Sequence, residues 1–175
     1  MQLRFPSSEL SYWASEFEFS AKEQRLLGYR ATVERNGFLR KPQLRLLANW
    51  KAPRSAPNIE RNSANYVEEI TRLSLSTSNE RARIEALTLL DGVQWPTASV
   101  VLHFFHVDKY PILDFRALWS LSTDVPSQYT FPFWETYVHY CRKLSRQHKL
   151  TMRELDKALW QYSKCRQLAN ERPGG

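Results

Sequence analysis

One segment of the sequence is the most informative about the fold: Leu89-Leu90-Asp91-Gly92-Val93-Gln94-Trp95-Pro96-Thr97-Ala98-Ser99-Val100-Val101-Leu102. An apolar helical pattern ends at Asp91-Gly92, which is a typical helix stop, and Pro96 suits the first turn of a second helix. A tight turn of this kind points backbone N–H groups outward at a helix N-terminus, where they can bind a phosphate without a basic side chain. The segment therefore predicts two helices joined by a phosphate-binding turn.

Helical patterns continue on both sides of this segment. Capping-box sequences begin at Ser20, Thr77 and Thr151, and Gly37 follows the first helical pattern as a stop signal. No strand alternation or internal repeat is evident in the sequence. The pattern therefore predicts an all-α fold, with helices over about 20–36, 42–50, 63–75, 77–90, 96 to a break at Tyr110-Pro111, 114–121, 133–148 and 151–169.

The composition excludes several classes of protein. A chain of 175 residues, 42% of them hydrophobic, fits one domain or two small lobes that share a core. Two cysteines exclude a four-thiolate metal site, and five glycines, two of them terminal, exclude a glycine-rich nucleotide loop. We expect no cofactor, no bound metal and no membrane partner. The predicted location is the cytoplasm, at the nucleoid in a bacterium, because no signal peptide or membrane-spanning run is evident.

The net charge of +7 is unevenly distributed along the sequence. Residues 22–54 contain nine basic and two acidic residues, and residues 142–166 contain eight basic and two acidic residues. Residues 55–141 contain six basic and ten acidic residues, so the middle of the chain is acidic. If the two basic stretches meet in the fold, they form one positive surface suited to the phosphates of a nucleic acid.

The order Leu-x-Gly-Val-x-x-x-Thr-Ala over residues 90–98, followed by apolar residues, resembles the hairpin of the helix-hairpin-helix base-excision DNA glycosylases. The resemblance continues to Asp114, which matches the family's aspartate, 18 residues after the hairpin position that carries a lysine in the bifunctional members. Here that position is Pro96. The family's second hairpin glycine is replaced by Gln94. The resemblance covers about residues 64–121.

The resemblance implies a monofunctional DNA glycosylase that acts on double-stranded DNA in base excision repair. Asp114 would be the catalytic carboxylate, and the missing lysine implies no strand-cleaving lyase activity. The residues expected at the DNA are Gly92, Gln94, Trp95, Thr97, Ala98, Lys51, Arg54 and Arg116. Those expected to line a pocket for a flipped base are Trp50, Tyr110 and Trp119, since aromatic rings stack on unpaired bases.

The resemblance also implies two small lobes with a cleft between them. Residues 1–62 and 149–175 would form a basic lobe, the last few residues being flexible, and residues 63–148 would form the hairpin domain. Two alternatives remain open on the sequence alone. The chain could be a non-catalytic helix-hairpin-helix module that binds nucleic acid, with Asp114 only capping a helix. It could also be a basic protein-interaction domain. The sequence does not specify an oligomeric state.

Overall fold

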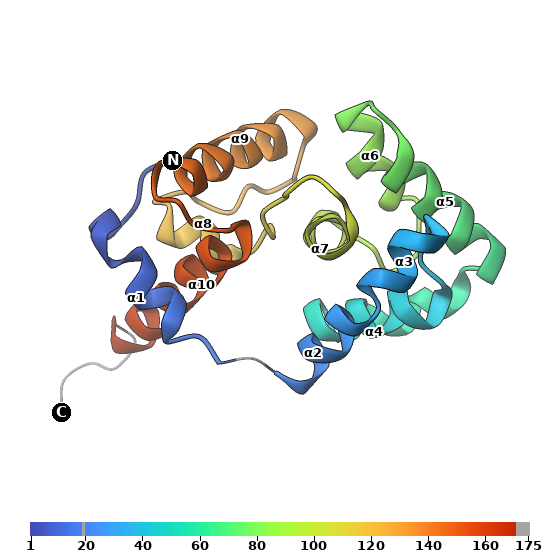
Figure 1. Cartoon of the computed structure of the whole chain (residues 1–175), viewed down its shortest axis with the longest axis horizontal. Coiled ribbons are helices and arrows are strands. Elements are labelled where there is room, and N and C mark those ends of the chain that lie inside the picture. The colour runs from blue at the N-terminus through green and yellow to red at the C-terminus, as the bar shows by residue number, and fades with distance from the viewer. Residues whose placement is uncertain (19, 171–175) are drawn as a thin grey trace. The chain divides into compact units, whose positions relative to one another are not determined.

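The computed structural model describes residues 1–18 and 20–170, and this part of the chain folds into helices and connecting loops without strands (Figure 1). The prediction of an all-α fold is confirmed. The expected flexibility of the last few residues concerns residues 171–175, which lie outside the described residues. No helix in the described ranges is both long and apolar enough to cross a bilayer.

Contacts between residues divide the chain into two units. The terminal unit contains residues 1–18 and the chain from residue 111 onward, and the inserted unit contains residues 19–110. The expected division placed residues 63–148 in the hairpin domain and residues 1–62, including the basic residues 22–54, with residues 149–175. In the structure residues 111–148 belong to the terminal unit, and the basic residues 22–54 are not with the C-terminal helices. Instead they belong with the hairpin, because the helix over Lys41–Lys51 packs on the second hairpin helix and buries Leu44 and Leu47.

The inserted unit is built around the second hairpin helix. Helix α7 (Trp95–Phe105) contacts three other helices of this unit, α3, α4 and α6. It is apolar around its whole circumference, as expected for a buried helix, and eight of its residues are buried: Thr97, Ala98, Ser99, Val100, Val101, Leu102, Phe104 and Phe105. The unit's other elements are α2 (Ala21–Gly28), α3 (Arg30–Asn36), α4 (Lys41–Lys51), the 3-10 helix η2 (Ala56–Arg61), α5 (Ala64–Ser76) and α6 (Glu80–Leu87).

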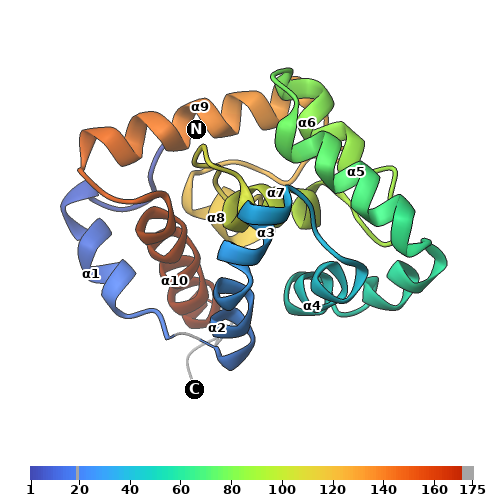
Figure 2. The same cartoon turned by 45° about the vertical axis from the view of Figure 1, so that its right-hand side comes forward.

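The terminal unit is organised by its last helix, α10 (Met152–Asn170). Helices α1 (Leu10–Ser15) and α8 (Phe115–Ser120) lie along α10, as Figures 1 and 2 both show. The 3-10 helix η1 (Ser7–Glu9) precedes α1, and α9 (Phe131–Gln147) packs on α10 through buried residues such as Tyr137. The Tyr137 hydroxyl donates to the backbone oxygen of Ile112 at 2.7 Å, which ties α9 to the segment that leads into α8.

Local capping rules place most helix starts correctly. Ser20 and Ser63 cap α2 and α5, and Thr151 with Glu154 forms a reciprocal capping box at the start of α10. The capping box expected at Thr77 is wrong. The N-cap of α6 is Asn79, whose side chain accepts from the backbone N–H of Ala82 at 2.9 Å, while Thr77 ends the preceding helix.

Candidate nucleic-acid interface

The backbone of the hairpin turn is hydrogen-bonded to a buried asparagine, Asn62, that lies before the hairpin in the sequence. Gly92 has φ +82°, a left-handed conformation that favours glycine. Asn62 donates to the backbone oxygen of Asp91 at 3.0 Å, and its side-chain oxygen accepts from the Asp91 N–H at 3.0 Å. This pairing joins the end of η2 to the turn and fixes the direction in which the chain enters α7. Asn62 was not among the residues expected at the site.

The loop after α4 lies directly against Gly92. A Cβ atom at this position would lie 2.8 Å from the backbone oxygen of Ser55 and 3.1 Å from the backbone nitrogen of Ile59. One side of the glycine is therefore covered by the chain itself. The same contact brings the exposed Arg54, an expected DNA contact, to the neighbourhood of the turn, since it immediately precedes Ser55. Lys51, the other expected contact in this loop region, is the last residue of α4, four residues before Ser55.

The first turn of α7 follows this hairpin turn. Its N-cap, Gln94, is exposed and extended, with φ −106° and ψ 171°, and its side chain makes no capping hydrogen bond. Trp95 is half-buried. The side chains of Thr97 and Ala98 are buried. The Ala98 N–H donates to the backbone oxygen of Gln94 at 2.8 Å, so of these two residues only Thr97 could reach a phosphate, through its backbone N–H. The donors available to an anion here belong to the backbone at the helix start.

Asp114 is the N-cap of α8, the first helix after the chain enters the terminal unit at residue 111. Its carboxylate accepts from the backbone N–H of Arg116 at 2.9 Å, and its side chain is half-buried. The expected capping role is therefore present. Capping and catalysis are compatible, because one backbone hydrogen bond occupies only part of the four acceptor positions of a carboxylate.

A tyrosine that the sequence did not single out lies within electrostatic reach of Asp114. Burial raises the pKa of Tyr129 above its usual value, and the negative charge of Asp114 raises it further. Tyr129 lies in the loop before α9, and its ring packs against Phe133. The raised pKa keeps the Tyr129 phenol protonated, and a protonated phenol is a hydrogen-bond donor.

The three aromatic residues expected in a base pocket have different environments. Tyr110 is fully buried in the inserted unit, so it offers no exposed ring face to a base, and that expectation is corrected. Trp50 is half-buried and packs edge-on against Phe104 of α7 at 5.6 Å. Trp119 belongs to the terminal unit, where it stacks on Tyr162 and lies under the guanidinium of Arg4 at 4.7 Å. Trp50 and Trp119 are therefore parts of different units.

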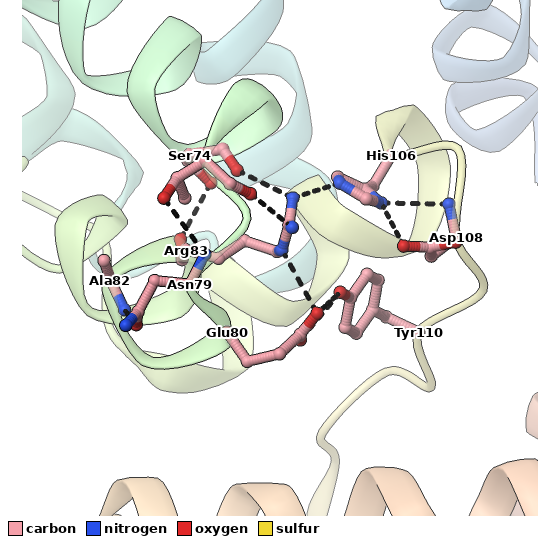
Figure 3. A network of polar contacts seen from close by, with 9 residues as sticks. Ser74, Asn79, Glu80, Ala82, Arg83, His106, Asp108 and Tyr110 are labelled. Atoms are coloured by element: carbon pink, nitrogen blue, oxygen red, sulfur yellow. Dashed lines mark hydrogen bonds and ion pairs between the residues drawn. The ribbon is translucent and has the colours of Figure 1, made fainter.

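A buried arginine organises the end of α7 (Figure 3). Arg83 of α6 is 5% exposed, and its guanidinium donates to the backbone oxygens of Ser74, at 3.3 Å, and Thr77. It also contacts Nε2 of His106, and its Nε lies 3.6 Å from the carboxylate of Glu80. A buried charge is tolerated only with such partners, so Arg83 holds α5, α6 and the end of α7 together.

Tyr110 completes this network. Its hydroxyl donates to the Glu80 carboxylate, 2.8 Å from each oxygen, and its ring packs edge-on against His106 at 5.2 Å. The backbone oxygen of Tyr110 lies 2.6 Å from Nδ1 of His103, which joins it to α7. Tyr110 is therefore held at its hydroxyl, its ring and its backbone. These contacts explain why it is a core residue and fix the last residue of the inserted unit.

His106 makes the stability of this network depend on pH. Burial lowers its pKa below the usual 6.5, and the positive charge of Arg83 lowers it further. Because the folded state favours the neutral imidazole, His106 gives its full stabilisation above pH 6.5, and this is lost as the pH falls from 6.5 toward the lower folded-state pKa. We expect the His106→Gln variant to lose less unfolding free energy than the wild-type protein as the pH falls through this range, as measured by urea denaturation. The control is His139→Gln, at an exposed residue outside this network, which should retain the wild-type pH dependence of stability. Equal effects of the two substitutions would contradict the role given to His106.

No group of three or more metal-ligating side chains gathers within the described residues.

The residues expected at the site are divided between the two units. The inserted unit contains the hairpin turn with its basic loop, and the terminal unit contains Asp114, Arg116 and Trp119. Comparison of the chain with protein-family models, with curated proteins and with solved structures finds no significant match in any of the three.

Proposed function

We propose that this protein binds double-stranded DNA and hydrolyses the N-glycosidic bond of a damaged or modified base, with Asp114 as the catalytic carboxylate. The observation that carries the proposal is the combination of a left-handed glycine turn leading into α7 with an aspartate at the start of α8. Both features occur at the positions that the resemblance to helix-hairpin-helix DNA glycosylases assigns to them.

One feature of the division supports the same proposal, although the boundaries of the units differ from those that the resemblance implies. In the family that the sequence resembles, the hairpin domain is an inserted run, and the N- and C-terminal helices pack together as the other lobe. Here residues 19–110 form one unit and both ends of the chain contribute to the other. Asp114 begins the first helix after the chain enters the terminal unit.

The chemistry assigns a defined task to the carboxylate. When the bond between C1′ and the base nitrogen breaks, its electron pair leaves with the base, and positive charge develops on the sugar. A fixed carboxylate stabilises that charge and orients the water that adds to C1′. Pro96 has no amine, so the reaction ends at an abasic site and does not pass through a covalent Schiff base between protein and sugar.

A second function is favoured by two of the contacts described above. Asp114 already caps α8, and Tyr110 is buried in the core, which fits a module that binds nucleic acid without catalysis. The two functions share the hairpin turn and its phosphate contacts. They differ only in base release.

The deciding experiment incubates the protein with duplexes that each contain one deaminated, oxidised, alkylated or mismatched base. The proposal predicts abasic sites, detected by alkaline strand cleavage, on at least one duplex. It also predicts no protein–DNA adduct when borohydride is added. Retention of DNA without base release on any duplex would leave only the binding module, and failure to retain DNA would exclude both functions.

The basic loop beside the hairpin should contribute to the salt dependence of DNA binding. Each phosphate that a protein neutralises on duplex DNA adds about 0.9 to the slope of log affinity against log salt concentration. We expect Arg54→Gln to reduce the magnitude of this slope by about 0.9. Arg81→Gln is the matched control, because Arg81 is an exposed arginine of the same unit that pairs with Glu85 at 3.0 Å. If both variants change the slope equally, Arg54 makes no particular phosphate contact.

A further inference from the structure

One face of α10 alternates cations and an aromatic ring. Arg153, Lys157, Trp160 and Lys164 follow one another at intervals of four, three and four residues, which places them on the same side of a helix. Phe17 and Arg116, from neighbouring segments of the terminal unit, contact this row. We call these six residues the α10 stripe.

Each ring of the α10 stripe is approached by two cations. The guanidinium of Arg116 and the ammonium of Lys164 lie 5.5 and 5.2 Å from the ring centre of Trp160. The side chains of Arg153 and Lys157 lie 5.1 and 5.7 Å from the ring centre of Phe17. The two rings meet edge-on at 5.4 Å. The contacts therefore form a continuous row of alternating positive groups and π-faces.

The charge of α10 has one sign beyond its first turns. Its two acidic residues lie beside the first two cations of the stripe. Asp156 forms an ion pair with Arg153, and Glu154, which forms the capping box with Thr151, also interacts electrostatically with Lys157. From Lys157 to Gln167 every charged residue is basic. Lys164 is exposed, whereas Trp160 and Lys157 are half-buried.

This arrangement matches the chemistry of an unpaired nucleic-acid strand, which alternates one flat base with one negatively charged phosphate. Stacking of a base on an aromatic side chain is a stronger interaction than an exposed cation–π contact. A base can therefore replace a cation on a ring with a net gain, and the displaced ammonium or guanidinium then pairs with a phosphate. An acidic peptide offers the charge without the flat rings.

We propose that the α10 stripe is a binding surface for single-stranded nucleic acid. Trp160 provides the stacking platform, and Lys157, Lys164 and Arg116 bind the phosphates on either side. This role requires neither base release nor a damaged duplex, so it stands or falls independently of catalysis by Asp114.

The test measures binding of a fluorescein-labelled oligothymidylate by anisotropy, together with quenching of tryptophan fluorescence. An oligouridylate of the same length is a second probe, and tight binding of either supports the proposal. We expect Trp160→Leu to weaken binding by at least about fivefold. The double variant Lys157→Gln/Lys164→Gln should reduce the log–log salt slope by about 1.4, because single strands contribute about 0.7 per phosphate.

The matched control is the double variant Lys143→Gln/Arg146→Gln. It removes the same charge from two exposed residues of α9 in the same unit. The proposal predicts wild-type affinity for this control. It is overturned if the wild-type protein does not bind either oligonucleotide, or if both double variants weaken binding equally. It is also overturned if oligoglutamate competes as well as the oligonucleotide, which would identify an acidic protein partner. Thermal melting of each variant by circular dichroism separates loss of binding from loss of folding.

Discussion

Replacement of Asp114 by asparagine is expected to reduce base release by about 100-fold or more while leaving DNA affinity unchanged. The substitution removes one negative charge and preserves shape, so the sugar loses the carboxylate that stabilises its developing positive charge. The measurement is the single-turnover rate of abasic-site formation on the duplex that the wild-type protein processes, with affinity determined on the same duplex.

The capping role of Asp114 makes this substitution informative. Asparagine and serine are as good N-caps as aspartate, so Asp114→Asn and Asp114→Ser should both retain the hydrogen bond to the Arg116 N–H and the stability of α8. Asp114→Ala should instead lose about 1 kcal/mol of stability. A catalytic role predicts loss of activity in all three variants. If only Asp114→Ala is impaired, Asp114 acts as a helix cap and nothing more.

Replacement of Gly92 by alanine is expected to destabilise the inserted unit by about 2–4 kcal/mol and to weaken duplex binding. Two costs add at this position. An alanine must adopt φ +82°, and its Cβ atom would lie 2.8 Å from the backbone oxygen of Ser55, which cannot move without displacing the loop. Urea denaturation gives the stability change, and anisotropy with an undamaged duplex gives the change in affinity.

Two other glycines separate these costs. Gly37 also has positive φ, at +75°, but no atom lies within 4 Å of an added Cβ, so Gly37→Ala should cost only about 1–2 kcal/mol. Gly28 has open space and no positive φ, so Gly28→Ala should be neutral or stabilising by up to about 1 kcal/mol. If Gly92→Ala costs no more than Gly37→Ala, the close packing of the hairpin turn against Ser55 is wrong.

Features that depend on neighbouring residues could be predicted from the sequence. Helix periodicity indicated the all-α class and the helix that begins near Ser63, and capping chemistry located the starts of the helices at Ser20, Asp114 and Thr151. The turn at Gly92, where φ is positive in the structure, was expected from its place after an apolar helical pattern. These signals are local, because a cap or a turn is determined within a few residues along the chain.

Features that depend on distant residues could not be predicted. Arg83 and His106 are 23 residues apart, and nothing in the sequence near either indicates that they share a buried contact. In the sequence Tyr110 resembles an aromatic residue of a loop, and only the fold shows that its hydroxyl donates to the carboxylate of Glu80. The division between units was misplaced for the same reason, since the packing of α4 on α7 joins segments that charge and loop composition separated.

Base hydrolysis by Asp114 is tested by the amount of free base released from a processed duplex, measured by mass spectrometry together with the amount of abasic site. Hydrolysis by Asp114 predicts equal amounts of both from the wild-type protein, strand breaks only after alkali, and neither product above background from Asp114→Asn. Equal release by the wild-type protein and Asp114→Asn, or the absence of free base from every duplex that the protein retains, would contradict it.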